Sequence, residues 1–325
     1  MNWPIGQFRP LFITQPVTLP SGKGNAMQTA DMTARMTSGQ GFIAALDQSG
    51  GSTPKALKGY GIEEGAYAGD EEMFALIHQM RARIITSPAF SGDKVLGAIL
   101  FERTMDGEIA GRPVPTVLAE RGVVPFIKID KGLEDEADGV QLMKPMPGLD
   151  TLLARAKGLG MYGTKERSVV QQANRAGIAA IVAQQVEIGR QVLAAGLMPI
   201  LEPEVNIKSA DRAQSDRILL EELLKALDAL PGEDRLMLKL SIPAQAGLFD
   251  PLVDHPRVLR VVALSGGYSR PDACSELARN RGMIASFSRA LLEDLRHQMS
   301  DADFDAALTG AIDEIYSAST SKVAA

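Results

Sequence analysis

The sequence predicts a single (β/α)₈ TIM barrel. Eight short apolar stretches are spread along the chain, longer segments with helical periodicity separate them, and no repeat or composition shift marks a domain boundary. Near-continuous apolar strands joined by helices are typical of a parallel sheet that is covered on its outer face. Eight such units in about 250 residues is the size of a barrel of this kind.

The predicted strands follow one another at intervals that leave room for helices. They are residues 41–46, 95–101, 123–129, 161–167, 197–203, 236–242, 258–264 and 282–288. The clearest helix is predicted over residues 211–230, where leucines recur at helical spacing. An open doubly wound sheet is the alternative fold, but no GxGxxG motif follows the first strand.

The chain is predicted to contain one domain. Residues 1–37 are expected to form a poorly ordered N-terminal extension, and residues 38–325 to form the barrel with a short C-terminal tail. The first 28 residues hold four prolines and no acidic residue, and they lack the features of a secretory signal.

Composition argues against several classes of function. The formal net charge of −6 gives no basic surface for nucleic acid or anionic lipid, and no apolar run reaches the roughly 18 residues of a membrane span. Cys274 is the only cysteine, which fits a reducing, cytoplasmic setting. His78, His255 and His297 lie far apart, so no histidine-rich metal site is expected.

Charged side chains stand inside or directly after five of the predicted strands. They are Asp47, Lys128, Asp130, Lys165, Arg167, Glu202, Glu204 and Lys239. The members of each pair two residues apart point to the same face of a strand. In a barrel these positions lie toward the carboxyl ends of the strands, where barrel enzymes keep their active sites. Solvated strand ends are the alternative for any one pair, but five strands together indicate one pocket of clustered charges.

Lys239 stands in the middle of an otherwise apolar strand, LMLKLSIP, and two interpretations are open. A neighbouring cation such as Lys165 and partial desolvation would favour a neutral amine that adds to a ketone, forming an iminium that promotes cleavage of a nearby C–C bond. Glu202 would then protonate the departing hydroxyl, and Asp47 would take a proton at the bond to be cleaved. Alternatively, Lys239 is simply ion-paired to a glutamate.

Two glycine-bearing turns suggest anion sites. LSGGYS (264–269) follows a strand and precedes a predicted helix, which suits a phosphate because glycine lets the backbone approach closely. Arg289 follows the last predicted strand and could hold the same anion. DQSGGSTPKAL (47–57) is the second turn, with Ser49, Ser52 and Lys55. Plain turns and a solvated Lys55 are the alternatives; two anion sites would suit a substrate with a phosphate at each end.

The motifs resemble those of the class I fructose-1,6-bisphosphate aldolases, in order, from about residue 38 to the last helix. The matching stretches are FIAALDQSGGSTPKAL, ILFERT, GVVPFIKIDKG, MYGTKERSV, MPILEPEV, LMLKLSIP, LSGGYS and SFSRAL. The resemblance implies a cytoplasmic glycolytic lyase that cleaves fructose 1,6-bisphosphate to dihydroxyacetone phosphate and glyceraldehyde 3-phosphate. It also implies a lysine Schiff base with no cofactor and no metal. It leaves the oligomeric state open.

The resemblance also implies roles for individual residues. Lys239 would form the iminium, Glu202 would act as acid and base, and Asp47 would handle the proton of the C4 hydroxyl. Lys165 would assist electrostatically, and Glu204 would position Lys165 and Lys239. The phosphate of the dihydroxyacetone half would contact Ser265, Gly266, Gly267 and Arg289. That of the aldehyde half would contact Ser49, Ser52, Lys55, Lys128 and Arg167.

The chain departs from the animal pattern of this family at several positions, and these departures resemble the shorter bacterial branch. Gln48 stands in place of a glutamate, Ala56 in place of an arginine, and Glu166 in place of a tryptophan. The Ala56 departure leaves the preference between fructose 1,6-bisphosphate and fructose 1-phosphate open. The chain ends soon after its last helical pattern, so Tyr316 is expected to pack a helix rather than assist catalysis.

Three other functions are less well supported by the sequence. Transaldolases and deoxyribose-phosphate aldolases share the imine chemistry but not the order of the EPE and LSGG motifs. A metal-dependent aldolase needs histidine ligands that this chain can hardly supply. A sugar-phosphate-binding protein that kept the fold would be expected to have lost a catalytic residue, whereas Asp47, Glu202 and Lys239 are all present.

Overall fold

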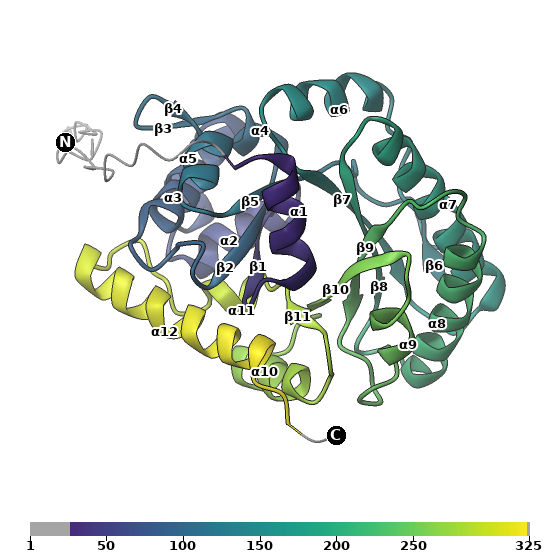
Figure 1. The fold of residues 1–325 in the computed structure, drawn as a ribbon. Coiled ribbons are helices and arrows are strands. Elements are labelled where there is room, and N and C mark those ends of the chain that lie inside the picture. Colours follow the sequence, from purple (N-terminus) through teal and green to yellow (C-terminus); the bar gives the residue numbers. More distant parts are fainter. Residues whose placement is uncertain (1–26, 324–325) are drawn as a thin grey trace, which may run out of the picture.

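The computed structural model describes residues 27–323, and these form a nearly closed (β/α)₈ barrel (Figure 1). The barrel strands pair in parallel, in the order β1, β2, β5, β7, β8, β9, β10, β11. Their bounds are Phe42–Leu46, Val95–Leu100, Val124–Lys128, Gly163–Val170, Met198–Val205, Leu236–Ser241, Val258–Leu264 and Ile284–Ala285. The ring closes where the Ala45 amide on β1 donates a hydrogen bond to the Phe287 carbonyl. The alternative of an open sheet is therefore wrong.

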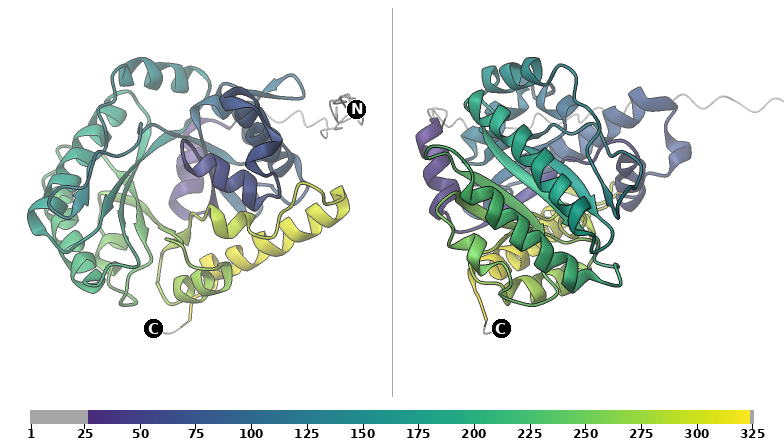
Figure 2. Two further views of the ribbon diagram at one scale, coloured as in Figure 1. Left: turned by 180° about the vertical axis from the view of Figure 1, so that it is seen from behind. Right: turned by 90° about the vertical axis from the view of Figure 1, so that its right-hand side faces the viewer.

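Helices surround the strands on the outside, as both further views confirm (Figure 2). The longer ones are α2 (Ser52–Gly59), α3 (Gly69–Thr86), α5 (Val114–Glu120), α6 (Leu149–Gly158), α7 (Arg175–Ala194), α8 (Arg212–Asp228), α10 (Arg270–Ala278) and α12 (Asp301–Thr320). Short turns are η1 (Glu64–Ala66), α4 (Glu102–Met105), α9 (Asp250–Val253) and α11 (Arg289–Leu292). Two small strands, β3 (Glu108–Ile109) and β4 (Arg112–Pro113), form a separate hairpin. None of these helices is long and apolar enough to cross a membrane.

Helix α1 (Thr29–Ser38) lies across the amino-terminal end of the barrel. Its Met32 and Met36 are buried against side chains of β1, β5 and β9, and the Met36 carbonyl accepts a hydrogen bond from Arg260. The expectation of a poorly ordered extension through residue 37 is therefore wrong for residues 29–37, because two methionines four residues apart give this helix an apolar face that closes the barrel. Residues 1–26 lie outside the described part of the chain.

Strand ends differ from the sequence prediction where pairing with neighbours decides their length. β7 and β8 pair along their full length as far as Val170 and Val205, and β6 (Val140–Gln141) adds an antiparallel partner to the end of β7. Both strands therefore continue past the predicted ends at residues 167 and 203. β11 is only two residues long instead of the predicted 282–288.

The barrel interior has an apolar layer and a charged layer. Ile43, Phe126, Ile200 and Met237 pack together with the methionines of α1 toward the amino ends of the strands. Side chains two residues further along a strand point to the same side, so the next inward-facing positions hold the charged residues of β5, β7, β8 and β9. The apolar layer excludes water from the amino-terminal end of the barrel, and the charged layer faces the opening at the carboxyl-terminal end.

Candidate active site

Five charged residues lie together inside the barrel near the carboxyl ends of its strands. Asp47 directly follows β1, Lys128 ends β5, Lys165 lies on β7, Glu202 on β8 and Lys239 on β9. Strand register pairs Lys128 with Lys165, and the side chains of Asp47, Lys165, Glu202 and Lys239 meet through ion pairs. The predicted convergence of these strands is confirmed.

Four of these side chains form one continuous row of ion pairs. The ammonium nitrogen of Lys239 lies 3.0 Å from one carboxylate oxygen of Glu202. The other oxygen of Glu202 lies 2.8 Å from the ammonium of Lys165, which is 2.7 Å from a carboxylate oxygen of Asp47. All four residues are buried, with exposed fractions between 2% and 9%. Glu202 therefore bridges two lysines, and Lys165 bridges two carboxylates.

The charges in this row outweigh the effect of burial on both carboxyl groups. Burial alone would raise the pKa of Asp47, but the neighbouring charges of Lys165 and Lys239 hold it well below its ordinary value. The same balance lowers the pKa of Glu202. Burial alone would lower the pKa of Lys165, whereas Asp47 and Glu202 raise it. At neutral pH, Lys165 is therefore a fixed cation between two ionised carboxylates.

Lys128 forms a second ion pair beside the row. Its ammonium donates to a carboxylate oxygen of Asp130 at 2.5 Å and to the Asp130 carbonyl at 2.9 Å. Burial lowers the pKa of Lys128, and the charge of Asp130 opposes this shift. The ion pair occupies one carboxylate oxygen of Asp130 and directs the ammonium of Lys128 toward the end of β5.

Glu204 pairs with a different residue from the two that the sequence resemblance implied. Within residues 27–323 its carboxylate forms a salt bridge with Arg167, on the neighbouring strand β7. The expected contacts with Lys165 and Lys239 are therefore wrong in this structure. Glu202 makes both of them instead, because it lies two residues deeper along β8 than Glu204.

The LSGGYS turn connects β10 to α10 as predicted. Gly266 and Gly267 have positive φ angles of 58° and 112°, which glycine tolerates and other residues rarely adopt. Ser265 is buried, and its carbonyl accepts a hydrogen bond from the Tyr268 amide. Arg289 is exposed at the start of α11, and within the described residues it forms no hydrogen bond or salt bridge. The turn and Arg289 follow neighbouring strands.

The second glycine-bearing turn follows Asp47 and enters α2. Ser49 and Ser52 bond to each other, because the Ser49 amide donates to the Ser52 hydroxyl at 2.9 Å and that hydroxyl donates back to the Ser49 carbonyl at 2.8 Å. Lys55 is exposed on the first turns of α2. These residues lie beside Asp47 on the chain, at the mouth of the barrel.

Two buried residues near the site were not predicted from sequence to belong to it. Arg81 on α3 donates hydrogen bonds to Gln48, the residue after Asp47. Glu166 on β7 faces outward between Lys165 and Arg167, is fully buried, and forms no well-aligned hydrogen bond with a described residue. Burial strongly raises the pKa of Glu166, and the charge of Asp130 adds to the effect. The sequence does carry a signal for the burial of Arg81, because it lies at helical spacing from Ile77 and Ile84 on the buried face of α3.

Metal ligands do not gather anywhere in the described part of the chain: no group of three or more histidine, cysteine, aspartate or glutamate side chains there could hold an ion.

Tyr316 lies in α12 and packs against the core, as expected from its place in the last helical pattern.

Comparison with known proteins agrees with this architecture. Residues 27–233 match the family model for class-I fructose-bisphosphate aldolase. Lys239, the LSGGYS turn and Arg289 lie beyond the matched segment. The fold is similar to that of fructose-bisphosphate aldolase from Plasmodium falciparum, solved in complex with TRAP and a small-molecule inhibitor. That chain is 20% identical, with a TM-score of 0.74 over 91% of this chain and 95% of that one.

A second solved structure, Cgl0159 from Corynebacterium glutamicum, is 15% identical, with a TM-score of 0.51 over 90% of this chain and 93% of that one. At such identities both structures support the fold alone, whereas the family model covers more than half of the chain. The chain therefore belongs to the class-I fructose-bisphosphate aldolase family.

Proposed function

We propose that this aldolase reversibly cleaves fructose 1,6-bisphosphate to dihydroxyacetone phosphate and glyceraldehyde 3-phosphate through a Schiff base on Lys239. The observation that carries the proposal is the buried row of ion pairs from Lys239 through Glu202 and Lys165 to Asp47. This row supplies a nucleophile, an acid–base group, a fixed cation and a second base in one pocket. A role in glycolysis, in the cytoplasm and without a metal, is part of this proposal.

Imine formation uses the contact between Lys239 and Glu202. The Lys239 ammonium passes a proton to the adjacent carboxylate of Glu202, and the freed amine attacks the C2 carbonyl of the substrate. Glu202 then delivers protons to the oxygen of the carbinolamine, which leaves as water. In sum, two protons of the ammonium leave with the ketone oxygen, and one positive charge stays on the iminium nitrogen. The fixed charge of Lys165 keeps Glu202 oriented during both transfers.

Cleavage uses Asp47. The iminium withdraws the electron pair of the C3–C4 bond, and the Asp47 carboxylate takes the proton of the C4 hydroxyl as the aldehyde forms. The charges of Lys165 and Lys239 lower the pKa of Asp47 and so keep this carboxylate ionised at neutral pH. The proton held by Asp47 then returns to C3 of the enamine left on Lys239, and water hydrolyses the resulting iminium to release dihydroxyacetone phosphate.

Two groups of residues are proposed to bind the phosphates. On the side of β10 and β11, the backbone amides of the LSGGYS turn and the Arg289 guanidinium would hold the phosphate of the dihydroxyacetone half. On the side of β1, β5 and β7, the second phosphate would contact residues at the barrel mouth. These are Ser49, Ser52, Lys55, Lys128 and Arg167. The ion pairs of Lys128 and Arg167 would loosen as the phosphate takes their place.

The test is borohydride reduction in the presence of dihydroxyacetone phosphate, followed by peptide mass spectrometry, with a cleavage assay in EDTA. We expect a stable adduct on the peptide that contains Lys239, and activity that survives EDTA. Lys239→Met is the matched control, which should lose both the adduct and cleavage. An adduct on another lysine, or none in the wild type, would overturn the mechanism. Binding of the sugar phosphate without an adduct or turnover would instead indicate a binding protein.

A further inference from the structure

Arg81 on α3 is a fully buried arginine that reaches the loop after Asp47. One of its terminal nitrogens donates to the Gln48 carbonyl at 2.6 Å and to the side-chain oxygen of Gln48 at 3.1 Å. The other donates to the Thr104 hydroxyl at 2.7 Å. The side chain is only 1% exposed. A single guanidinium therefore clamps the main chain and the side chain of the residue that follows the proposed base.

Gln48 extends this clamp to the far side of the barrel mouth. Its side-chain amide nitrogen donates to the Ser288 hydroxyl at 2.7 Å and to the Ala45 carbonyl at 3.3 Å. Ser288 directly precedes Arg289, a proposed phosphate ligand, and Ala45 precedes Asp47 by two residues on β1. The bonds thus connect α3, the Asp47 loop and the Arg289 loop.

Holding a charge in this place costs stability. Burial lowers the pKa of Arg81 to about 10, and the charge of Asp47 opposes the shift. Among the described residues no carboxylate lies within salt-bridge distance of Arg81, and its inner nitrogen Nε has no hydrogen-bond partner. A hydrophobic side chain of similar length would avoid this cost. The forked geometry of the guanidinium, which can serve Gln48 and Thr104 at once, accounts for an arginine here.

We propose that Arg81 is a positioning residue of the aldolase site: by fixing Gln48 it holds the Asp47 carboxylate in place for C–C cleavage. This inference rests on the proposed function. The role of Arg81 concerns C–C cleavage and not imine formation, because Lys239 and Glu202 are held by β9 and β8 and do not depend on Gln48. Loss of Arg81 should therefore slow cleavage much more than imine formation.

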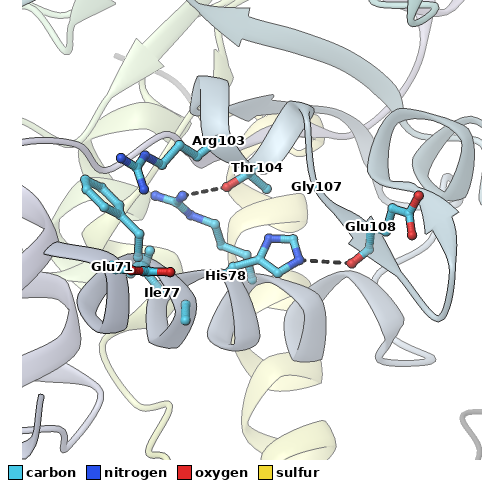
Figure 3. Close-up of a pocket in the computed structure, with 10 residues that line it drawn as sticks. Glu71, Ile77, His78, Arg103, Thr104, Gly107 and Glu108 are labelled. Atoms are coloured by element: carbon cyan, nitrogen blue, oxygen red, sulfur yellow. Dashed lines mark hydrogen bonds between the residues drawn. The ribbon is translucent and has the colours of Figure 1, made fainter.

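A cavity of about 370 Å³ lies between α3, α4 and β3, and Arg81 forms part of its wall; Figure 3 shows the cavity from the side of His78 and Thr104. Its wall includes Thr104, which accepts the hydrogen bond from Arg81, and His78, which contacts the Glu108 carbonyl at 3.0 Å. The cavity lies outside the barrel and away from Lys239. It gives small solutes a route to the position of the guanidinium when the side chain is shortened.

The test compares Arg81→Met with the wild type in two assays. One is the rate of borohydride trapping of dihydroxyacetone phosphate at Lys239, and the other is kcat for cleavage of fructose 1,6-bisphosphate. We expect trapping within about twofold of the wild type and cleavage slower by about 10- to 100-fold, as for a modest misplacement of a reacting group. Arg81→Lys should not restore cleavage, because an ammonium lacks the fork.

Arg83→Met is the matched control. Arg83 lies on the same helix, but its guanidinium bonds to the Met299 carbonyl and to Asp301 at the start of α12. Its loss should lower thermal stability without separating trapping from cleavage. Arg81→Ala with millimolar guanidinium adds a rescue measurement: cleavage should recover in part through the cavity, whereas Arg83→Ala should show no such recovery.

The outcomes distinguish the two proposals. Cleavage by Arg81→Met within twofold of the wild type, or a parallel fall of trapping and cleavage, would overturn the role of Arg81 and leave the aldolase mechanism intact. Absence of both trapping and cleavage in the wild type would overturn the proposed function and this inference with it.

Discussion

Replacing Glu166 by glutamine should stabilise the protein, by an amount that grows with pH. Glu166 is fully buried on the outer face of β7, and burial holds its pKa well above the ordinary value of 4.5. The carboxyl group therefore stays protonated in the folded protein at pH values where it ionises in the unfolded chain. Ionisation favours the unfolded state, so Glu166 costs more stability as pH rises. Glutamine has nearly the same shape and cannot ionise.

The size of this effect follows from proton linkage. While the group keeps its proton when folded and loses it when unfolded, each pH unit above the unfolded pKa costs about 1.4 kcal/mol. Between pH 5 and pH 7 the gain from Glu166→Gln should therefore grow by up to about 3 kcal/mol. A change of this size is a large fraction of the roughly 5–15 kcal/mol that stabilises a typical protein.

The assay is urea unfolding followed by circular dichroism at pH 5, 6 and 7 for both proteins. The other ionisable groups are common to the two chains, so the difference in unfolding free energy isolates position 166. Glu233→Gln, on the exposed loop after α8, is the control and should differ from the wild type by less than about 0.5 kcal/mol at every pH. A difference for Glu166→Gln that does not change with pH, or that falls as pH rises, would refute the reasoning.

Three further predictions concern the turns and the single cysteine. Gly266→Ala should distort the phosphate-binding turn, because an added Cβ at φ 58° would lie only 2.6 Å from the Ile207 side chain. KM for fructose 1,6-bisphosphate should rise about tenfold in steady-state assays, and an unchanged KM would argue against phosphate binding at this turn. Lys55→Ala should raise KM for fructose 1,6-bisphosphate but not for fructose 1-phosphate, which lacks the second phosphate, and equal effects on both would contradict the assigned subsite. Cys274 is buried, and burial raises its pKa to about 12. A disulfide reagent at pH 8 should therefore modify the thiol only after unfolding, and rapid labelling of the folded protein would contradict this prediction.

The fold could be predicted from sequence because a parallel barrel repeats one local pattern. Each strand is an apolar run between segments that form helices, and five of the eight predicted strands match the observed ones to within one residue at each end. The exceptions depend on pairing. β7 and β8 continue because each provides the other with backbone partners as far as Val170 and Val205. Helix α1 was missed because its apolar face contains only Met32 and Met36, whose burial depends on the open end of a barrel.

By itself, the sequence determined which residue types stand at the inward positions near the strand ends, because alternation along a strand fixes the face on which each side chain lies. This placed Asp47, Lys165, Glu202 and Lys239 in one pocket before their distances were known. It could not determine which carboxylate pairs with which cation, since that depends on the stagger between neighbouring strands. Tertiary structure decided that Glu202 bridges the two lysines, while Glu204 turns to Arg167.

Tertiary structure also decided the surroundings of residues to which the motifs assign no role. Arg81 is one of several arginines in helical segments, and its importance comes from the packing of α3 against the Asp47 loop. Glu166 alternates with two site residues on β7, yet it is buried behind the barrel rather than exposed. In both cases the energetic consequence is set by desolvation and by partners distant in sequence, and only the folded chain brings these together.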